Sequence, residues 1–523
     1  MTKLKKAITL LLQLLKQFFT NQGFKTRVTY TTYYKWLKVR KNVILYESYH
    51  GRNISCNPLA IFRCLYNDTK YKGYIHIWAV DDLNNESVKH FRGYKNVRFV
   101  KINSRAYFKA LVTAKYLVNN TSFPYYFQKK EDQVYINTWH GTPIKAMGKD
   151  IKNAAFAEHK NIQRNFLHAD FLIHPNQYTL EKMVHSYDID GIYAGALLDT
   201  GYPRVDLMFN ADTEKIKEIL KIPEGKKVIL YAPTWRGEGH KEEDTSKQLM
   251  NELEEIRRNI SEQYVVLLKS HYFVQKFFQR NGIDHFVVPG WIDTNELLSI
   301  VDILITDYSS IMFDFFVTRR PVIFYVPDFE EYYFERGLYL DYNDLPGPKC
   351  SSIEEVIASI NSIDAIHSEY VDRYDSIVKK YCYNDDGSAT KRLVEVVFEN
   401  KHPQLKKYIN NTNKTKLLMY CGGFYSNGIT TSALNLLNMI DYNRYDVTIV
   451  DFDKKVPETL ENIKKVNPNA KLVFRFADWN MTLLEAFQHN IVIRKGLYKN
   501  FVKKIAPIKM YHRELKRVIG NCE

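Results

Sequence analysis

The segment Thr138-Trp139-His140-Gly141-Thr142-Pro143 contains residue types that are suited to acid–base chemistry. It follows the apolar run Val134–Ile136 and ends in proline, which is tolerated at the first position of a helix. A histidine on such a strand-to-helix turn is expected at the carboxyl edge of a sheet, where open α/β folds bind ligands. Because histidine titrates near neutrality, His140 is suited to take a proton from a hydroxyl nucleophile. The alternative interpretation is a histidine that only caps the turn.

Three further apolar runs also end in polar or basic residues. The fork of an arginine side chain suits a phosphate, and the free amides and dipole at a helix start favour an anion. The plainer alternatives are a surface arginine beside a packed tryptophan and an ordinary serine cap. If all four motifs face one cleft, the site handles diphosphate charge with Arg, His and helix amides. The residues concerned are Thr234 and Arg236 after Val228–Tyr231, His271 after Tyr264–Leu268, and Asp307, Ser309 and Ser310 after Ile303–Thr306.

The elements that must position these residues alternate between strand-like and helix-like stretches. Such alternation predicts an α/β fold with parallel sheets and crossover helices. Two series in tandem predict two Rossmann-like domains, over residues 42–210 and 211–408, that face a cleft. Residues 416–523 suffice for one further small α/β domain. Besides those already named, the expected strands are Val43–Tyr46, Ile75–Val80, Val97–Lys101, Tyr116–Asn119, Val134–Asn137, Phe171–His174, His285–Val288, Val322–Val326, Leu417–Tyr420 and Asp446–Asp451.

Composition limits the cofactor chemistry. The 523 residues include six cysteines with no CxxC pair, which argues against a disulfide framework or a zinc knuckle and fits a reducing compartment. No metal-ligand motif is evident, and the acidic pair Asp81-Asp82 is interpreted as a solvated turn. We therefore expect no tightly bound cofactor, and we expect chelation to leave much of the activity.

Residues 1–41 form a basic arm. They hold ten lysines or arginines and no acidic residue, in a chain of net charge +15. The apolar run Ala7–Leu15 is shorter than the ~20 residues that span a bilayer, and no small-residue cleavage site follows it. A basic amphipathic helix on an anionic membrane surface is favoured over nucleic-acid binding, with packing on the protein's own core as the alternative. Deletion of residues 1–40 is then expected to release the protein from anionic vesicles.

The four motifs in their order resemble the CDP-glycerol glycerophosphotransferase family of teichoic acid synthesis. The resemblance covers about residues 40–400, through WHGTPIK, YAPTWR, the strand ending in His271 and TDYSSIMFDF. The segments TGYPR and DYNDLPGP support it. One departure is Val205, which precedes Asp206 where the family usually has asparagine.

The resemblance implies a GT-B arrangement, with the acceptor side in residues 42–210 and the donor side in residues 211–408. The implied reaction transfers glycerol phosphate or ribitol phosphate from a CDP-activated donor to a hydroxyl of a lipid-linked teichoic acid precursor, releasing CMP. The implied location is peripheral, at the cytoplasmic face of the cell membrane. The residues carried over are His140 as base, His271 beside the diphosphate, Arg236, Thr234, Asp307, Ser309 and Ser310 for the donor, and Trp139, Gly141 and Thr142 on the acceptor side.

Several points stay open at the level of sequence. They include glycerol versus ribitol in the donor, single addition versus polymerisation, and partnership with a second copy or with other envelope-synthesis enzymes. Gly422 to Thr430 resembles the opening of the acceptor half of GT-B glycosyltransferases, so this tail could bind acceptor, assist folding or be a remnant. The alternative functions are a nucleotide-sugar-dependent GT-B glycosyltransferase and a non-catalytic membrane scaffold.

Overall fold

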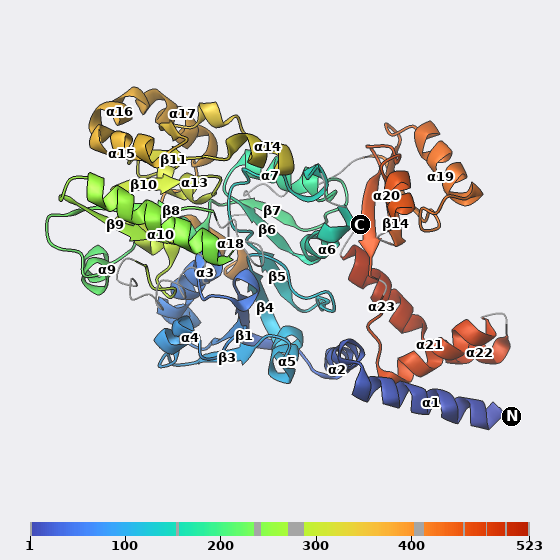
Figure 1. Ribbon diagram of the computed structural model, residues 1–523. Helices are drawn as coiled ribbons and strands as arrows, with labels where there is room; N and C mark the ends of the chain where they lie inside the picture. The colour runs from blue at the N-terminus through green and yellow to red at the C-terminus, as the bar shows by residue number, and fades with distance from the viewer. Residues whose placement is uncertain are drawn as a thin grey trace.

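The computed structural model describes residues 3–152, 156–234, 242–269, 287–401, 413–452, 456–476, 478–496 and 499–520. These residues form three parallel sheets with helices packed around them (Figure 1). The sheet orders are β3-β2-β1-β4-β5-β6-β7, β12-β11-β10-β8-β9 and β13-β14-β15. All strand pairings within these sheets are parallel, so the predicted α/β class is confirmed.

The seven-stranded unit positions the His140 turn. Its inner strand β1 (Arg40–Glu47), which lies between β2 and β4, sends Val43 and Leu45 into one core, and Ile44 and Tyr46 into another on the opposite face. That alternation follows from the two-residue period of a strand. The remaining elements are β2 (Ile75–Val80), β3 (Val97–Lys101), β4 (Ala114–Asn119), β5 (Val134–Asn137), β6 (Phe171–His174), β7 (Ala196–Asp199), α3 (Cys56–Asn67), α4 (Glu86–Phe91), α5 (Arg105–Thr113), α6 (Lys160–His168), α7 (Gln177–Ser186) and α8 (Pro203–Phe209).

The five-stranded unit follows in sequence, but its last helix returns to the seven-stranded unit. Leu393 and Val394 of that helix, α18 (Ala389–Phe398), are buried in the core that contains Ile44 and Tyr46. The chain thus crosses between the two units twice. The other elements are β8 (Lys227–Ala232), β9 (Tyr264–Leu268), β10 (Ile303–Thr306), β11 (Val322–Tyr325), β12 (Lys349–Cys350), α9 (Thr213–Ile219), α10 (Glu242–Asn259), α12 (Thr294–Leu298), α13 (Ile311–Phe316), α14 (Phe329–Arg336), α15 (Ile353–Asn361), α16 (Ile363–Glu369) and α17 (Val371–Tyr381).

The basic arm folds into α1 (Lys3–Thr20) and α2 (Gln22–Trp36), which differ in their environment. Tyr30 of α2 is buried against Phe108 and Tyr126 of the seven-stranded unit. Packing on the protein's own core therefore describes α2, and deletion of residues 1–40 would remove a core side chain as well as α1. Among the residues that the structure covers, no helix is long and apolar enough to cross a membrane.

The C-terminal unit lies beside α1 and the seven-stranded unit (Figure 1). Gln163 of α6 donates a hydrogen bond from Nε2 to the Leu472 carbonyl at 2.6 Å, and the fully buried Arg517 donates one to the Tyr125 carbonyl at 2.9 Å. These contacts fix the unit on the seven-stranded unit. Its elements are β13 (Thr415–Met419), β14 (Tyr445–Phe452), β15 (Lys471–Arg475), α19 (Gly428–Met439), α20 (Pro457–Ile463), α21 (Leu483–Lys495), α22 (Asn500–Ile505) and α23 (Ile508–Ile519).

Candidate functional site

His140 lies on the turn after β5, where one hydrogen bond orients its ring. Its Nδ1 is 2.7 Å from the Asn120 carbonyl oxygen. A carbonyl only accepts hydrogen bonds, so Nδ1 carries the proton and Nε2 keeps its lone pair. Burial lowers the pKa of His140 from 6.5 to about 4; Arg204 and His50 lower it further and the Asn120 carbonyl opposes them. His140 is therefore neutral at pH 7, which is the form a general base requires.

The backbone around His140 contains left-handed residues that are not glycine. Trp139 has φ +50°, and the loop after β1 places Tyr49 at +48° and His50 at +57°. Such conformations are uncommon for bulky residues and concentrate at functional sites. The Tyr49 ring lies 5.7 Å from the His140 ring, and the Tyr49 amide donates to Asn120 Oδ1 at 2.9 Å. This loop was not predicted from the sequence, although Tyr49-His50-Gly51 shortly after a strand was a usable signal.

A buried ion pair joins the His140 turn to the five-stranded unit. Arg204, at the start of α8, donates from Nη1 to the His140 carbonyl at 2.6 Å and from Nη2 to Asp314 of α13 at 2.9 Å. Both side chains are almost fully buried. Burial opposes the charge on Arg204, but Asp314 and other neighbours outweigh it, and the pKa of Arg204 lies well above its ordinary value. Arg204 is therefore a charged group that links the His140 turn to α13 of the five-stranded unit.

Asn57 strengthens the same link. Its Nδ2 donates to the carbonyls of Thr138 and Trp139 at 3.3 and 3.1 Å, and its Oδ1 accepts from the Arg204 amide at 2.9 Å. The side chain is completely buried. Asn57 thereby holds the strand end of the turn and the start of α8 at a fixed separation. This role could not be predicted from local sequence patterns, because the three segments are far apart in the chain.

The first and fourth motifs meet at Gly141 and Ser310. Gly141 has φ +152°, and a Cβ built on it would lie 2.4 Å from Ser310 Oγ. Only glycine permits this approach, because any side chain would displace the serine. Ser310 is the N-cap residue of α13, as expected, yet its side chain makes no capping hydrogen bond. The Ser310 hydroxyl thus lies beside the His140 turn, and the ordinary serine-cap interpretation is wrong for this residue.

The second and third motifs are described in part. Thr234 donates from its amide and its hydroxyl to Asp307, with the hydroxyl contact at 2.6 Å, so the ends of β8 and β10 are joined. Lys269, at the end of β9, donates to the Ile292 carbonyl at 2.9 Å. Burial lowers the pKa of Lys269 to about 8. Arg236 and His271 lie outside the described residues, so their predicted roles stay predictions.

Pro143 does not start a helix, which corrects the sequence interpretation. The chain after it runs extended beside residues 337–339. The Ala146 amide donates to the Gly337 carbonyl at 3.0 Å, and the Tyr339 amide donates to the Ile144 carbonyl at 2.8 Å. Backbone hydrogen bonds between the two units are formed here in place of the helix expected after Pro143.

The three acceptor-side candidates belong to the turn that contains His140, and they differ in their surroundings. Trp139 and Thr142 are buried, and Thr142 Oγ1 accepts from Asn176 Nδ2 at 3.3 Å. They therefore hold the turn in place, whereas Gly141 faces Ser310 as described above. Across the described ranges, no three His, Cys, Asp or Glu side chains form a group that could hold a metal ion.

If His140 is the catalytic base, as predicted from the sequence, its burial sets the pH dependence of turnover. A pKa of about 4 means that the ring gains a proton only as the pH falls through that value. The base form is then complete by about pH 6, and the acid limb of kcat/KM should lie well below the ordinary value of 6.5. A kcat/KM profile from about pH 5 to pH 8 tests this. A limb near pH 6.5 would mean that the catalytic base is a solvated imidazole.

Comparison with known proteins places this arrangement in context. The family model described as CDP-Glycerol:Poly(glycerophosphate) glycerophosphotransferase matches residues 29–399. The teichoic acid glycerol-phosphate transferase of Staphylococcus aureus (strain NCTC 8325 / PS 47) is 35% identical over 387 residues, which cover 71% of this chain and 96% of that protein. The teichoic acid poly(glycerol phosphate) polymerase of Bacillus subtilis (strain 168) is 32% identical over 379 residues, covering 69% of this chain and 49% of the polymerase. This chain thus spans about half the length of that polymerase.

A solved structure shows the same fold. The structure of the wall teichoic acid polymerase TagF superposes with a TM-score of 0.63 at 29% identity, covering 78% of this chain and all of that one. The match to the family model ends at residue 399, so it contains β1–β12 and leaves the C-terminal unit outside.

Proposed function

Because the chain belongs to the CDP-glycerol:poly(glycerophosphate) glycerophosphotransferase family, we propose that it transfers glycerol phosphate from CDP-glycerol to a hydroxyl of a lipid-linked teichoic acid precursor. CMP is the other product. The observation that carries the proposal within the site is His140, a neutral imidazole whose Nδ1 is held by a carbonyl and whose Nε2 is free to accept a proton.

In the proposed mechanism His140 Nε2 takes the proton of the acceptor hydroxyl. The hydroxyl oxygen attacks the glycerol-bearing phosphorus, and the bond from that phosphorus to the CMP oxygen breaks in line. Such transition states are loose, so positioning and charge stabilisation supply most of the acceleration. Arg204 and Asn57 hold the turn that carries the base, and act as positioning residues.

The donor is proposed to lie against the five-stranded unit in a GT-B arrangement. The ends of β8, β9 and β10 carry Thr234, Lys269 and Asp307 there, and Ser309 and Ser310 precede α13. Arg236 and His271 follow β8 and β9 in sequence, so the same strand ends lead toward both. We propose that these groups hold the diphosphate, with Asp307 orienting Thr234. Trp139, Gly141 and Thr142 shape the acceptor side.

The enzyme is proposed to act peripherally at the cytoplasmic face of the membrane, where a lipid-linked acceptor would be reached. The support is α1, on which the apolar side chains of Ile8, Leu12 and Phe19 are exposed among lysines. A helix of this composition binds an anionic lipid surface through burial of its apolar stripe and through charge.

A donor panel tests the proposed function. Full-length protein is incubated with a lipid-like acceptor and, in turn, with CDP-glycerol, CDP-ribitol and UDP-sugars, and nucleotide release is followed. We expect CMP release to be fastest with CDP-glycerol. Faster release from CDP-ribitol would reassign the polyol, and release of UDP alone would indicate a glycosyltransferase.

A further inference from the structure

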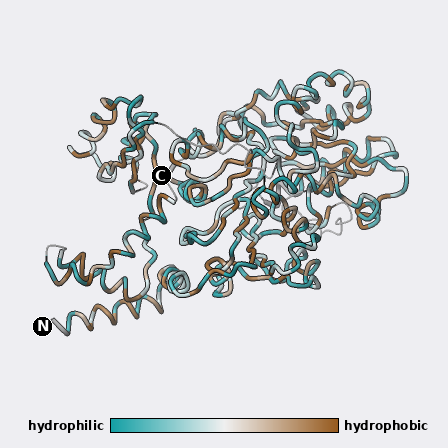
Figure 2. The backbone as a smooth tube through the Cα atoms, turned by 180° about the vertical axis from the view of Figure 1, so that it is seen from behind, coloured by the Kyte–Doolittle hydropathy of each residue, from teal (hydrophilic) through white to brown (hydrophobic). Residues whose placement is uncertain are grey.

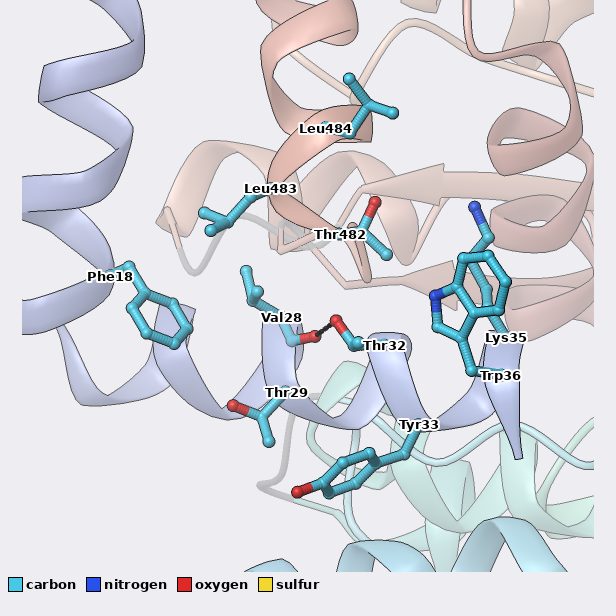
Figure 3. Close-up of a pocket in the computed structure, with 10 residues that line it drawn as sticks. All are labelled: Phe18, Val28, Thr29, Thr32, Tyr33, Lys35, Trp36, Thr482, Leu483 and Leu484. Carbon is cyan, nitrogen blue, oxygen red and sulfur yellow. Dashed lines mark hydrogen bonds between the residues drawn. The ribbon is translucent and has the colours of Figure 1, made fainter.

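A pocket lies between the N-terminal arm and the start of α21 in the C-terminal unit. It has a volume of about 440 Å³ and is open to solvent on one side. The side chains of Phe18, Val28 and Leu483 converge on it from three different helices (Figure 3). It is predominantly apolar, and no motif of the proposed transferase site contributes to it. Its lining residues are Phe18, Val28, Thr29, Thr32, Tyr33, Lys35, Trp36, Thr482, Leu483 and Leu484.

The walls of the pocket are held together as one body. Leu10 and Leu14 of α1 pack with Phe24 and Val28 of α2 and with Ala486 of α21 in a buried cluster. Polar contacts reinforce the packing, because the buried Glu485 carboxylate accepts from Lys35 at 2.9 Å and from Arg513 at 2.8 Å. The pocket is thus preformed between the arm and the C-terminal unit, as ligand sites usually are.

The rim of the pocket is exposed and apolar. Trp36 and Leu484 both line the pocket and are 76% and 66% exposed, and Phe19, next to the lining residue Phe18, is 75% exposed. On α1 the exposed residues Ile8, Leu11, Leu12 and Phe19 recur at helical spacing, on a different side from the buried Leu10 and Leu14. Figure 2 shows hydrophobic and hydrophilic residues alternating along this helix. Apolar surface of this extent usually marks a contact with a membrane or a partner.

The positive charge of the neighbouring helices favours a membrane over a partner protein as the occupant. The exposed lysines Lys5, Lys6 and Lys16 lie on α1, and the exposed lysines Lys495, Lys503 and Lys504 lie on α21 and α22. No acidic residue occurs before Glu47. An exposed tryptophan at an apolar pocket, with exposed lysines on the neighbouring helices, matches the polar–apolar boundary of an anionic bilayer.

We propose that this pocket binds a hydrocarbon chain of an anionic bilayer phospholipid, and that the exposed lysines of α1, α21 and α22 attract the anionic headgroups of the same bilayer. The C-terminal unit is then half of a lipid-binding site whose other half is the arm. The inference deepens the proposed function, since it rests on an enzyme that works at a membrane. It gives the C-terminal unit, which lies beyond the matched family region, a role that needs no second transferase site.

Brominated lipids test the pocket directly, because bromine on an acyl chain quenches a tryptophan that touches it. Full-length protein is mixed with phosphatidylglycerol vesicles with and without brominated chains, and the quenching of wild type is compared with that of Trp36→Phe. We expect the wild type to be quenched and most of the quenching to be lost in Trp36→Phe. Equal quenching of the two proteins would overturn the proposal.

A second variant tests the contribution of the C-terminal unit. Leu484→Glu places a carboxylate at an exposed position in the first turn of α21, where it suits the helix dipole and leaves the fold intact. We expect binding to anionic vesicles to weaken by about tenfold or more, since a leucine is lost from the lipid phase and a like charge is added. The control is Val371→Glu on α17, which is 48% exposed and lies far from the pocket (Figure 1).

Vesicle binding by Leu484→Glu equal to that of Val371→Glu would contradict the proposal. CMP release from CDP-glycerol with a short soluble acceptor is measured on the same preparations and should match wild type. Failure of the lipid site changes only vesicle binding and quenching, whereas failure of the proposed function removes CMP release from every protein including wild type.

Discussion

Replacing His140 with glutamine is expected to lower kcat/KM for CDP-glycerol by about 10²–10⁴-fold, because the variant loses the nitrogen that accepts the acceptor proton. Asn57 and Arg204 still hold the backbone carbonyls of the turn in this variant, so the turn should stay in place. The fall should appear mainly in kcat, with donor affinity little changed. Steady-state kinetics and calorimetric titration with the donor measure the two effects.

The matched control is His512→Gln, which changes an exposed histidine of α23 that no part of the proposed mechanism uses. It should retain wild-type turnover. Near-normal turnover in His140→Gln, with an unchanged fold by circular dichroism, would remove His140 from the role of base.

Arg204→Met is expected to destabilise the protein by about 3–5 kcal/mol, because it leaves the buried Asp314 carboxylate without its partner. It should also reduce kcat, because the contact from Arg204 to the His140 carbonyl is lost. Asp314→Asn should act in the same direction. Urea unfolding measures the stability, and a pH profile of the residual activity reports whether His140 has been repositioned.

The matched control for the ion pair is Arg258→Met. Arg258 pairs with Glu254 on the surface of α10 at 3.0 Å, and both side chains are well exposed. Exposed pairs contribute about 0–1 kcal/mol, so this variant should unfold almost like wild type. Equal losses in Arg204→Met and Arg258→Met would show that the buried pair does not link the two units.

Local sequence patterns were sufficient for most of the fold. Six of the expected strands, such as Ile75–Val80 and Tyr264–Leu268, have the predicted ends, because β-branched or aromatic runs between turn residues leave few alternatives. The strand Ala196–Asp199 was missed because Ala-Leu-Leu-Asp has no such residue, and Lys349–Cys350 was missed because it is too short. Lys471–Arg475 was overlooked although its Leu-Val-Phe core is a usable signal.

The features that were not predicted from the sequence depend on contacts between residues far apart in the chain. Pro143 fits a helix start locally, yet residues 144–146 pair with residues 337–339 of another unit, which no local rule anticipates. The Arg204–Asp314 pair joins residues 110 apart in sequence, and both lie inside motifs that the sequence had already marked. The packing of α1 on α21 joins segments that lie more than 450 residues apart in the sequence, so no local sequence pattern could predict it.

The most direct test of the central claim is the fate of the donor phosphorus. CDP-glycerol labelled in the glycerol phosphate is incubated with the full-length enzyme and an acceptor, and the acceptor is analysed by mass spectrometry and ³¹P NMR. We expect the label to enter a new phosphodiester on the acceptor, one for each CMP released, and His140→Gln to form almost none. CMP release without labelled acceptor, or label that appears only as free glycerol phosphate, would contradict that claim.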